Sequence, residues 1–411
     1  MNQNLRSQAN RIVKEAIAAV QPDAAVRRAL AGKEFPGRVV LVAAGKAAWQ
    51  MAKAAHNVLG SRIDKGVVVT KYHHVMGEIP GVLCREAGHP VPDENSFSAT
   101  REALEAVSGL TEKDTVLFLL SGGGSALFED PLVSGEELQD ITRQLLACGA
   151  DIVEMNTIRK RLSNVKGGRF AQHCAPAQVY AIVLSDILGD PLDMIASGPA
   201  CPDTATCAEA MAIVEKYGLK LSQTSLELLR QETPKELSNV TTQINGSVKE
   251  LCAAAAKSCE ELGYTPVMLT DQLDCQAKEA GAFLAAVAKT HAGSGKKLAF
   301  IAGGETVVHL TGSGLGGRNQ ELALSAAMGI AGLAGVCVFS IGSDGTDGPT
   351  DAAGGYVDTD TDKTLKEQGI DIFSVLQNND AYHALQACEG LVITGPTGTN
   401  VNDVAVVLIE E

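Results

Sequence analysis

The sequence predicts an α/β protein built from two Rossmann-like domains with an active-site cleft between them. Apolar runs long enough for strands buried on both faces alternate with helical patterns along the chain. The composition is 45% hydrophobic but only 4% aromatic, which suits sheets covered by Ala-rich helices. The length of 411 residues exceeds that of one typical domain. Together these observations favour two α/β units.

The first half of the chain is predicted to alternate strands and helices after an amphipathic N-terminal segment. Near-continuous apolar runs predict buried parallel strands at Val39–Ala43, Gly66–Thr70, Val82–Glu86, Thr115–Leu120 and Val179–Leu184. Helical periodicity is found at Ala47–Leu59, Ser98–Val107, Glu136–Ala147 and Val153–Leu162.

A polar stretch from Gln231 to Asn245, which contains Pro234 and little apolar periodicity, marks the expected domain boundary. We therefore expect domains at residues 1–235 and 236–411. In the second domain the expected helices are Val248–Leu262, Ala277–His291 and Asn319–Ile330. The expected strands are Thr265–Leu269, Leu298–Ala302, Thr306–Val308, Val336–Ile341, Leu391–Thr394 and Val404–Ile409.

Charge and cysteine usage exclude several classes of function. The formal net charge of −15 argues against a protein that binds nucleic acid or an acidic membrane, because both need a basic surface. The ten cysteines form no CxxC pair and no zinc-ligand spacing, which is typical of reduced thiols in the cytosol. No stretch resembles a signal peptide or a membrane span. We expect a cytoplasmic protein.

Two helices are predicted to begin beside a cation, where the free backbone amides make the surroundings electropositive. Arg318 follows a glycine-rich loop and opens the helix Asn319–Ile330, and Lys46 follows Gly45 and opens the helix Ala47–Leu59. An exposed cation in that position costs about 0.3–1 kcal/mol. Each lies beside glycine, which lets backbone approach a ligand, so the pattern indicates that an anion binds near Lys46 and Arg318.

Two further segments offer groups for binding phosphate or substrate. The loop Ser121-Gly122-Gly123-Gly124-Ser125 follows a predicted strand, and its successive glycines can turn backbone N–H groups toward a phosphate. Asn156 and Lys160 are four residues apart on one predicted helix face, within a run of five cations. We expect that this pair points into the cleft, although a solvated basic face is an alternative.

Acidic residues follow two other strands and could hold a metal ion or accept a proton. Asp186 lies just past the strand Val179–Leu184, and Asp344 lies in an acidic loop just past Val336–Ile341. The Asp344 loop lacks the calcium EF-hand spacing but suits Mg²⁺, which needs only one or two carboxylates beside phosphate oxygens. In contrast, His89, in Gly88-His89-Pro90, has no partner at ligand spacing, which favours a turn or surface role.

Two enzyme classes and one binding function remain open on these residues. Gly312-x-Gly314-x-x-Gly317 matches the dinucleotide fingerprint, so an NAD(P)-dependent oxidoreductase is one candidate. The acidic residue expected at the end of the next strand is missing there, since Asp344 comes three residues later. Phosphoryl transfer uses the glycine loops, the two cations and the acidic loops together. A sugar-phosphate sensor is the third candidate.

Several long motifs, in order along almost the whole chain, resemble the class II glycerate 2-kinases, whose C-terminal part is the MOFRL domain. They are LLSGGGSAL, NTIRKRLSNVKGGR, LSDILGDPLDMIASGPACPD, GGETVVHLTGSGLGGRNQELAL, GSDGTDGPTDAAGG and TGPTGTNVND. The resemblance implies ATP- and Mg²⁺-dependent phosphorylation of D-glycerate to 2-phosphoglycerate. Some members of the family are called hydroxypyruvate reductase, which keeps an NAD(P)H-dependent reductase as the alternative.

The resemblance also maps the essential Lys and Arg of the family onto Lys46 and Arg318. We expect these two cations and Asp186 to be the catalytic residues, with Asp186 accepting the proton of the 2-hydroxyl. Asp344 or Asp186 would hold Mg²⁺. The expected nucleotide and substrate contacts are Ser121, Gly122, Gly123, Gly124, Ser125, Asn156, Lys160, Glu305, Gly316 and Gly317. A homodimer is the candidate assembly.

Overall fold

The chain forms two compact units, which the computed structural model describes over residues 1–410. The first-sheet unit comprises Pro22–Asn245, and the second-sheet unit comprises Gly246–Glu411 together with Met1–Gln21. This division differs from the predicted boundary in two respects. The N-terminal helix belongs to the second-sheet unit, and the polar stretch before Asn245 belongs to the first-sheet unit.

The first-sheet unit contains a six-stranded sheet of order β3-β2-β1-β4-β5-β6, in which β1 to β5 are parallel. The strands are β1 (Val39–Ala44), β2 (Ile63–Lys71), β3 (Val82–Ala87), β4 (Thr115–Leu120), β5 (Gln178–Leu184) and β6 (Val240–Gly246). This is the doubly wound order, and it confirms the Rossmann-like expectation for this half. The order reverses between β1 and β4, which is where such sheets bind ligands.

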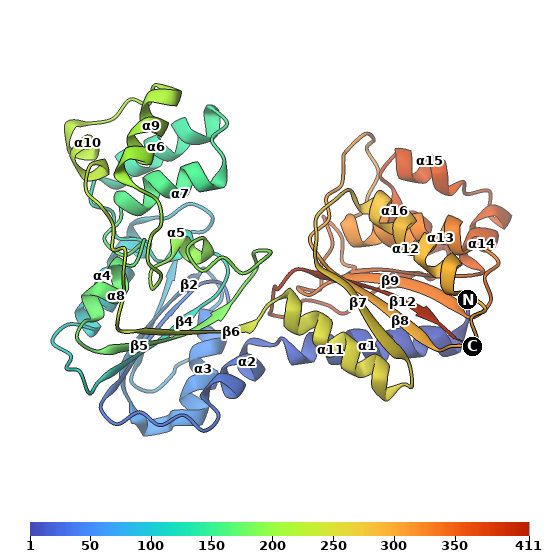
Figure 1. Cartoon of the computed structure of the whole chain (residues 1–411), viewed down its shortest axis with the longest axis horizontal. Coiled ribbons are helices and arrows are strands. Elements are labelled where there is room, and N and C mark those ends of the chain that lie inside the picture. The colour runs from blue at the N-terminus through green and yellow to red at the C-terminus, as the bar shows by residue number, and fades with distance from the viewer. Residues whose placement is uncertain (411) are drawn as a thin grey trace. The chain divides into compact units, whose positions relative to one another are not determined.

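Strands β1 and β4 are buried along their whole length because helices cover both faces. Val40 and Val42 belong to one hydrophobic core and Val39 and Leu41 to the other, as the two-residue period of a strand requires. The helices are α2 (Pro22–Leu30), α3 (Ala48–Leu59), α4 (Glu94–Ala106), α5 (Gly124–Leu127), α6 (Gly135–Ala147), α7 (Ile152–Arg161), α8 (Arg169–Cys174), α9 (Cys207–Tyr217) and α10 (Gln223–Leu229), with short 3₁₀ turns η1 (Gly60–Arg62) and η2 (Ile195–Ser197). Helices α6, α7, α9 and α10 gather in a separate layer with its own core (Figure 1).

The second-sheet unit contains a mixed six-stranded sheet of order β11-β10-β9-β12-β8-β7. Only β7 and β8 are neighbours in parallel, and β12 is antiparallel to both β8 and β9. The strands are β7 (Thr265–Leu273), β8 (Leu298–Gly304), β9 (Val336–Gly342), β10 (Gly354–Asp358), β11 (Leu391–Val392) and β12 (Asp403–Ile409). The carboxyl ends of β8 and β9 therefore lie at the same edge as the first residue of β12.

Helices cover the second sheet on both faces (Figure 1). They are α1 (Gln3–Ala19), α11 (Val248–Glu261), α12 (Ala277–His291), α13 (Arg318–Ile330), α14 (Thr361–Glu367), α15 (Ile372–Gln377) and α16 (Ala381–Ala387). Helices α1 and α11 pack together and lie side by side against one face. Among the described helices, none combines the length and the apolar character that spanning a bilayer requires.

Three predictions of local structure need correction. The expected strand Thr306–Val308 is only an isolated bridge from Val307 to Gln276, because the chain leaves the sheet after Gly304. Strand β6 lies at the end of the stretch expected to be a linker. Its polar residues Thr241, Thr242 and Gln243 hide the strand pattern, but the segment lies beside β5 in the sheet. The antiparallel strand β10 was not predicted.

The N-terminal helix α1 has a buried apolar face, formed by Leu5, Ala9, Ile12, Val13, Ala16 and Ile17. Several polar contacts tie its other residues to the second-sheet unit, among them a contact of Arg11 with Glu261 at 2.8 Å. Ser258 Oγ donates to Glu15 Oε2 at 2.5 Å, and Tyr264 Oη donates to Gln8 Oε1 at 2.6 Å. Helix α1 thus belongs to the second-sheet unit, although it precedes the first-sheet unit in the sequence.

We predict that Ile12→Ala lowers the free energy of unfolding by about 2–5 kcal/mol, because it leaves a cavity under α1. Hydrogen exchange should increase in β9 and α11 and stay unchanged in β1 to β5. Ser7→Ala, on the exposed side of the same helix, is the control and should change little. Faster exchange confined to Pro22–Asn245 would contradict the assignment of α1.

Candidate active site

Lys46 and the glycine loop Ser121–Ser125 meet at the switch point of the first sheet. Lys46 follows β1 and the glycine loop follows β4, the two strands between which the order reverses. The backbone N–H of Lys46 donates to the carbonyl of Gly122 at 2.9 Å, and Ala47 N–H donates to Ser121 Oγ at 3.0 Å. The predicted neighbours Lys46, Ser121 and Gly122 are therefore in contact.

Glycine is required at positions 122 and 123 because side chains pack directly against the backbone there. A Cβ on Gly122 would lie 2.1 Å from Asp186 Oδ2. A Cβ on Gly123, whose φ is +85°, would lie 3.1 Å from Lys46 Cγ and 3.0 Å from the His89 ring. Asp186 and His89 follow β5 and β3, so groups from several strand ends surround this loop.

The glycine loop presents unpaired backbone donors beside these side chains. Within the described residues, the N–H groups of Gly122, Gly123, Gly124 and Ser125 have no hydrogen-bond acceptor. Lys46 Nζ has no ion-pair partner among residues 1–410 either. Unpaired amides next to a cation are the equipment of a phosphate or carboxylate site. The expectation of an anion near Lys46 is thus in keeping with its surroundings.

Asn156 supports the glycine loop from helix α7. Its side-chain oxygen accepts a hydrogen bond from Ser197 Oγ at 2.9 Å, and Ser197 Oγ lies 3.2 Å from Ser125 Oγ. Ala196 and Ser197 have φ of +50° and +62°. Residues other than glycine adopt this left-handed backbone conformation at a cost of about 1–3 kcal/mol each. Strained backbone next to a binding loop is common at functional sites.

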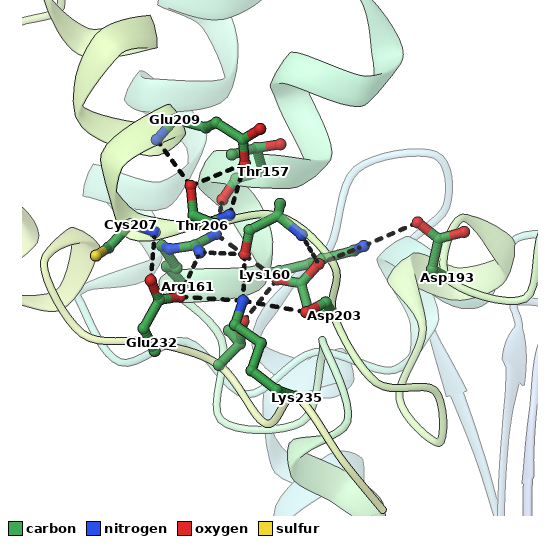
Figure 2. Close-up of polar contacts among 12 residues, drawn as sticks. Thr157, Lys160, Arg161, Asp193, Asp203, Thr206, Cys207, Glu209, Glu232 and Lys235 are labelled. Carbon is green, nitrogen blue, oxygen red and sulfur yellow. Dashed lines mark hydrogen bonds and ion pairs between the residues drawn. The ribbon is translucent and has the colours of Figure 1, made fainter.

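Lys160 lies in a buried ion-pair network and not in an open site (Figure 2). Its side chain is 3% exposed, and Nζ lies 3.0 Å from Asp203 Oδ1 and 3.4 Å from Asp193 Oδ2. Burial would raise the pKa of Asp203, but the hydrogen bond from Thr233 and the charge of Lys160 together lower it. This placement favours a structural role for Lys160 over the predicted contact with substrate.

The remaining cations of that segment are not a solvated face. Arg161 is fully buried, and its Nη2 lies 3.2 Å from Glu232 Oε2. Lys166 is also fully buried, and its Nζ lies 2.6 Å from Glu129 Oε2. Figure 2 shows Arg161 and Lys160 from α7 pointing toward the acidic residues of the segments around Asp203 and Glu232. Lys160 and Arg161 thus join the helical layer to the segments after β5 that carry Asp203 and Glu232, whereas Lys166 pairs with the segment after α5.

In the second-sheet unit, Arg318 is held by two carboxylates. Its Nε and Nη2 donate to Asp403 Oδ2 and Oδ1 at 2.5 and 3.0 Å, and its Nη1 donates to Glu305 Oε1 at 2.9 Å. Asp403 is the first residue of β12, and Glu305 directly follows β8, which pairs with it. Burial raises the pKa of Asp403 to about 6, although the Arg318 guanidinium opposes that rise.

The start of helix α13 is also occupied by a carboxylate of the protein. Asp347 accepts hydrogen bonds from the backbone N–H groups of Asn319 at 3.1 Å and Gln320 at 2.9 Å. A Cβ on Gly317 would lie 2.3 Å from the Asp347 carboxyl carbon. The charge conflict inferred at Arg318 is thus resolved inside the unit by Asp347, Asp403 and Glu305. A bound anion is not needed to explain it.

The glycines of the dinucleotide fingerprint are explained by packing. Gly312 and Gly314 lie against the turn at Asn378–Asp380, where a Cβ on either would come within 2.4 Å of that turn. The N–H of Gly312 donates to Asn379 Oδ1, and the N–H of Gly314 donates to the carbonyl of Asn378. With Asp347 at the helix start, this loop has no place for a dinucleotide pyrophosphate, which that fingerprint would put there. Gly316 packs beside Ala381.

Asp344 lies close to Asp403 at the same edge of the sheet. A Cβ on Gly342 would lie 3.4 Å from the Oδ1 atoms of both. Asp344 Oδ1 accepts from the Thr346 N–H and hydroxyl, which leaves Oδ2 without a hydrogen bond among the described residues. Residues 1–410 hold no group of three or more His, Cys, Asp or Glu side chains able to bind a metal alone. The donor set suits Mg²⁺ completed by phosphate oxygens.

Sequence reasoning missed His89, Asp347 and Asp403 as parts of these clusters. Asp403 carries the same signal that selected Asp186, namely a carboxylate adjoining a buried strand, whereas His89 follows β3, which is only partly buried. The sequence did not single out Asp403 because β12 runs antiparallel to its neighbours. The first residue of β12, and not its last, therefore lies beside the carboxyl ends of β8 and β9.

Comparisons with known proteins agree with this architecture. Residues 8–230 match a family described as a domain of unknown function, DUF4147, and residues 298–403 match the MOFRL family. The D-glycerate 2-kinase of Thermotoga maritima is 55% identical, over 99% of both chains. The chain belongs to the glycerate 2-kinase family.

Other members of the family resemble the chain along its whole length. The glycerate 2-kinase of Pyrococcus horikoshii is 41% identical over 97% of this chain and 96% of its own. The crystal structure of a glycerate kinase from Thermotoga maritima has a TM-score of 0.96 at 55% identity and covers 99% of this chain and 100% of its own. Both units therefore have the fold of that glycerate kinase.

We predict that Lys160→Met lowers the free energy of unfolding of the first-sheet unit by about 1–3 kcal/mol, because Asp203 then loses the nearer of its two buried cations and keeps only Arg161, at 3.6 Å. Urea unfolding followed by the fluorescence of Trp49, the single tryptophan, measures it. The control Lys216→Met breaks an exposed ion pair with Glu154 and should cost about 1 kcal/mol or less. Unchanged stability with a raised KM would restore the predicted contact with substrate.

Proposed function

We propose that this chain transfers the γ-phosphoryl group of ATP to the 2-hydroxyl of D-glycerate and forms 2-phosphoglycerate. The observation that carries the proposal is the meeting of Lys46, four unpaired amides and Asp186 at the switch point of the first sheet. It occurs in a chain whose full length is similar to glycerate 2-kinases. Phosphoryl transfer depends mainly on positioning and on neutralising charge, which these groups supply.

The first-sheet site suits an oxyanion of nucleotide or substrate. The amides of Gly122–Ser125 would donate hydrogen bonds to it, and Lys46 would contribute a mobile positive charge. Asp186, fixed against Gly122, would orient the 2-hydroxyl and accept its proton. Asn156 would act through Ser197 and Ser125 by holding the loop in place.

The second-sheet cluster suits a cation together with phosphate oxygens. Asp344, Glu305, Asp347 and Asp403 outnumber Arg318, so this edge carries excess negative charge. Asp344 would hold Mg²⁺, which neutralises and orients phosphate oxygens when bound. Of the five guanidinium N–H groups of Arg318, three are engaged, so two remain for a phosphate or carboxylate. Gly316 and Gly317 pack against Ala381 and Asp347, so their backbone contacts with a ligand stay a prediction.

An assay on the purified chain distinguishes the kinase from the reductase alternative. With D-glycerate, ATP and Mg²⁺ we expect ADP and 2-phosphoglycerate to form in equal amounts. With hydroxypyruvate and NADH or NADPH we expect no oxidation of the nicotinamide, since the fingerprint loop is filled by Asn378–Asp380. Nicotinamide oxidation without ADP formation would replace the proposal with the reductase.

We predict that Arg318→Lys lowers kcat/KM by about 10²–10³, because lysine cannot keep two carboxylates and still present a planar fork to an anion. Circular dichroism should show an unchanged fold, since Lys still places one charge beside Asp403. Arg143→Lys, at a 74% exposed side chain, is the matched control and should turn over normally. Near-normal turnover of Arg318→Lys would reject its catalytic role.

A further inference from the structure

His89 is fixed at the carboxyl edge of the first sheet by the residues around it. It lies two residues after β3, in the loop 88–91. The carboxylate of Asp93 accepts a hydrogen bond from the backbone of Gly88 and another, at 2.6 Å, from the hydroxyl of Tyr72 just past β2. Asp93 also caps helix α4. One carboxylate thus ties the loop that carries His89 to β2 and α4.

The His89 ring lies against the glycine loop beside Lys46. The site where a Cβ on Gly123 would stand is 3.0 Å from His89 Cδ2, 3.1 Å from Nε2 and 3.1 Å from Lys46 Cγ. The imidazole and the lysine stem therefore flank the same glycine. No side chain larger than hydrogen fits between them without displacing one of the two.

Both ring nitrogens of His89 lack a hydrogen-bond partner among residues 1–410. The ring is only partly buried, so a ligand can reach it. The neighbouring His74 differs, because its Nδ1 is engaged with the carbonyl of Lys46 at 3.1 Å. The His89 ring thus lies against the glycine loop, and neither the ring nor the amides of Gly122 and Gly123 have a hydrogen-bond partner among the described residues.

The charges around His89 come from each adjoining strand end. Lys46 follows β1 and Lys71 ends β2, while Asp186 lies across Gly122 and Asp93 lies behind Gly88. Partial burial, followed by the charges of Lys46 and Lys71, lowers the pKa of His89. This shift favours the neutral imidazole, and an anion placed among these groups would favour its protonated form.

We propose that Nε2 of His89 donates a hydrogen bond to an oxyanion, carboxylate or phosphate, that is bound at Lys46 and the Gly122–Ser125 amides. The proposal deepens the proposed function and rests on it, since D-glycerate and ATP supply those two oxyanions. His89 is then a substrate-contacting residue of the reaction. Protonation of its ring and binding of the anion favour each other by linkage.

Nuclear magnetic resonance titration of the histidine rings in the full-length protein tests the contact directly. The His89 signal is assigned by its loss in His89→Gln. We expect D-glycerate or inorganic phosphate, each added alone to saturation, to raise the pKa of His89 by about one unit or more. A rise with only one of them identifies which oxyanion the ring contacts. His56, which lies on α3, should not respond.

Kinetics provide a second measurement that a merely structural role would not change. If binding raises the pKa of His89 by one unit, the anion binds about tenfold more tightly to the protein with a protonated ring. KM should therefore fall as the pH is lowered from the pKa of the complex to the pKa of the free enzyme. His89→Gln keeps a donor but cannot titrate, and it should remove this pH dependence while kcat changes less. His89→Ala should raise KM about tenfold, and the control His56→Gln should behave like the unchanged protein.

The outcomes separate the two proposals. If the protein phosphorylates D-glycerate while neither ligand moves the pKa of His89, the contact is overturned and the kinase stands. If phosphate shifts His89 in a protein without kinase activity, the anion contact stands and the proposed function fails. A pH dependence of KM that persists in His89→Gln also overturns the contact.

Discussion

The close packing of backbone at Gly122 and Gly123 is the constraint on which the first-sheet site depends. Asp186, His89 and Lys46 reach the glycine loop from the ends of β5, β3 and β1. Asp186 occupies space that a Cβ on Gly122 would take, and His89 and Lys46 would crowd a Cβ on Gly123. The same compactness leaves the loop amides without acceptors in the part of the chain that the structure describes. The doubly wound order explains the convergence, because parallel strands put all their carboxyl ends at one edge and the reversal of order opens that edge between β1 and β4.

The functional edges of the two sheets carry charged side chains of opposite sign. At the edge of the first sheet, Lys46 and His89 flank Gly123 beside amides that have no acceptor among the described residues, and these surroundings suit an anion although Asp186 lies against Gly122. At the edge of the second sheet, carboxylates from β8, β12 and the loop after β9 surround a single arginine. Kinase chemistry needs both kinds of environment, since phosphate oxygens bind amides and cations while the metal ion binds carboxylates.

The ion pairs of helix α7 have a different purpose from either edge. Lys160 and Arg161 of α7, and Lys166 just beyond its end, are buried and paired, and breaking such pairs is costly because a bare charge then stays inside the protein. Through Asp193, Lys160 connects the helical layer to the segment that carries Ala196 and Ser197, whose strained backbone lies against Gly124 and Ser125. A rigid support of this kind can hold a strained loop in a single conformation.

The sequence by itself determined the alternating architecture, the strand ends at Lys46, Ser121 and Asp186, and the family, because apolar runs and glycine loops are local signals. The family name rested on long motifs read as a resemblance. Tertiary structure alone decided what each charge meets. Arg318 and Lys160 both stood out as candidates for binding anions, yet one is held by Asp403 and Glu305 and the other is buried on Asp203. Asp403 lies 85 residues from Arg318 in the sequence. Its strand is also antiparallel to its neighbours, so the first residue of the strand lies at the functional edge. Spacing along a chain cannot show such long-range pairings, since they depend on how strands are ordered and directed in the sheet.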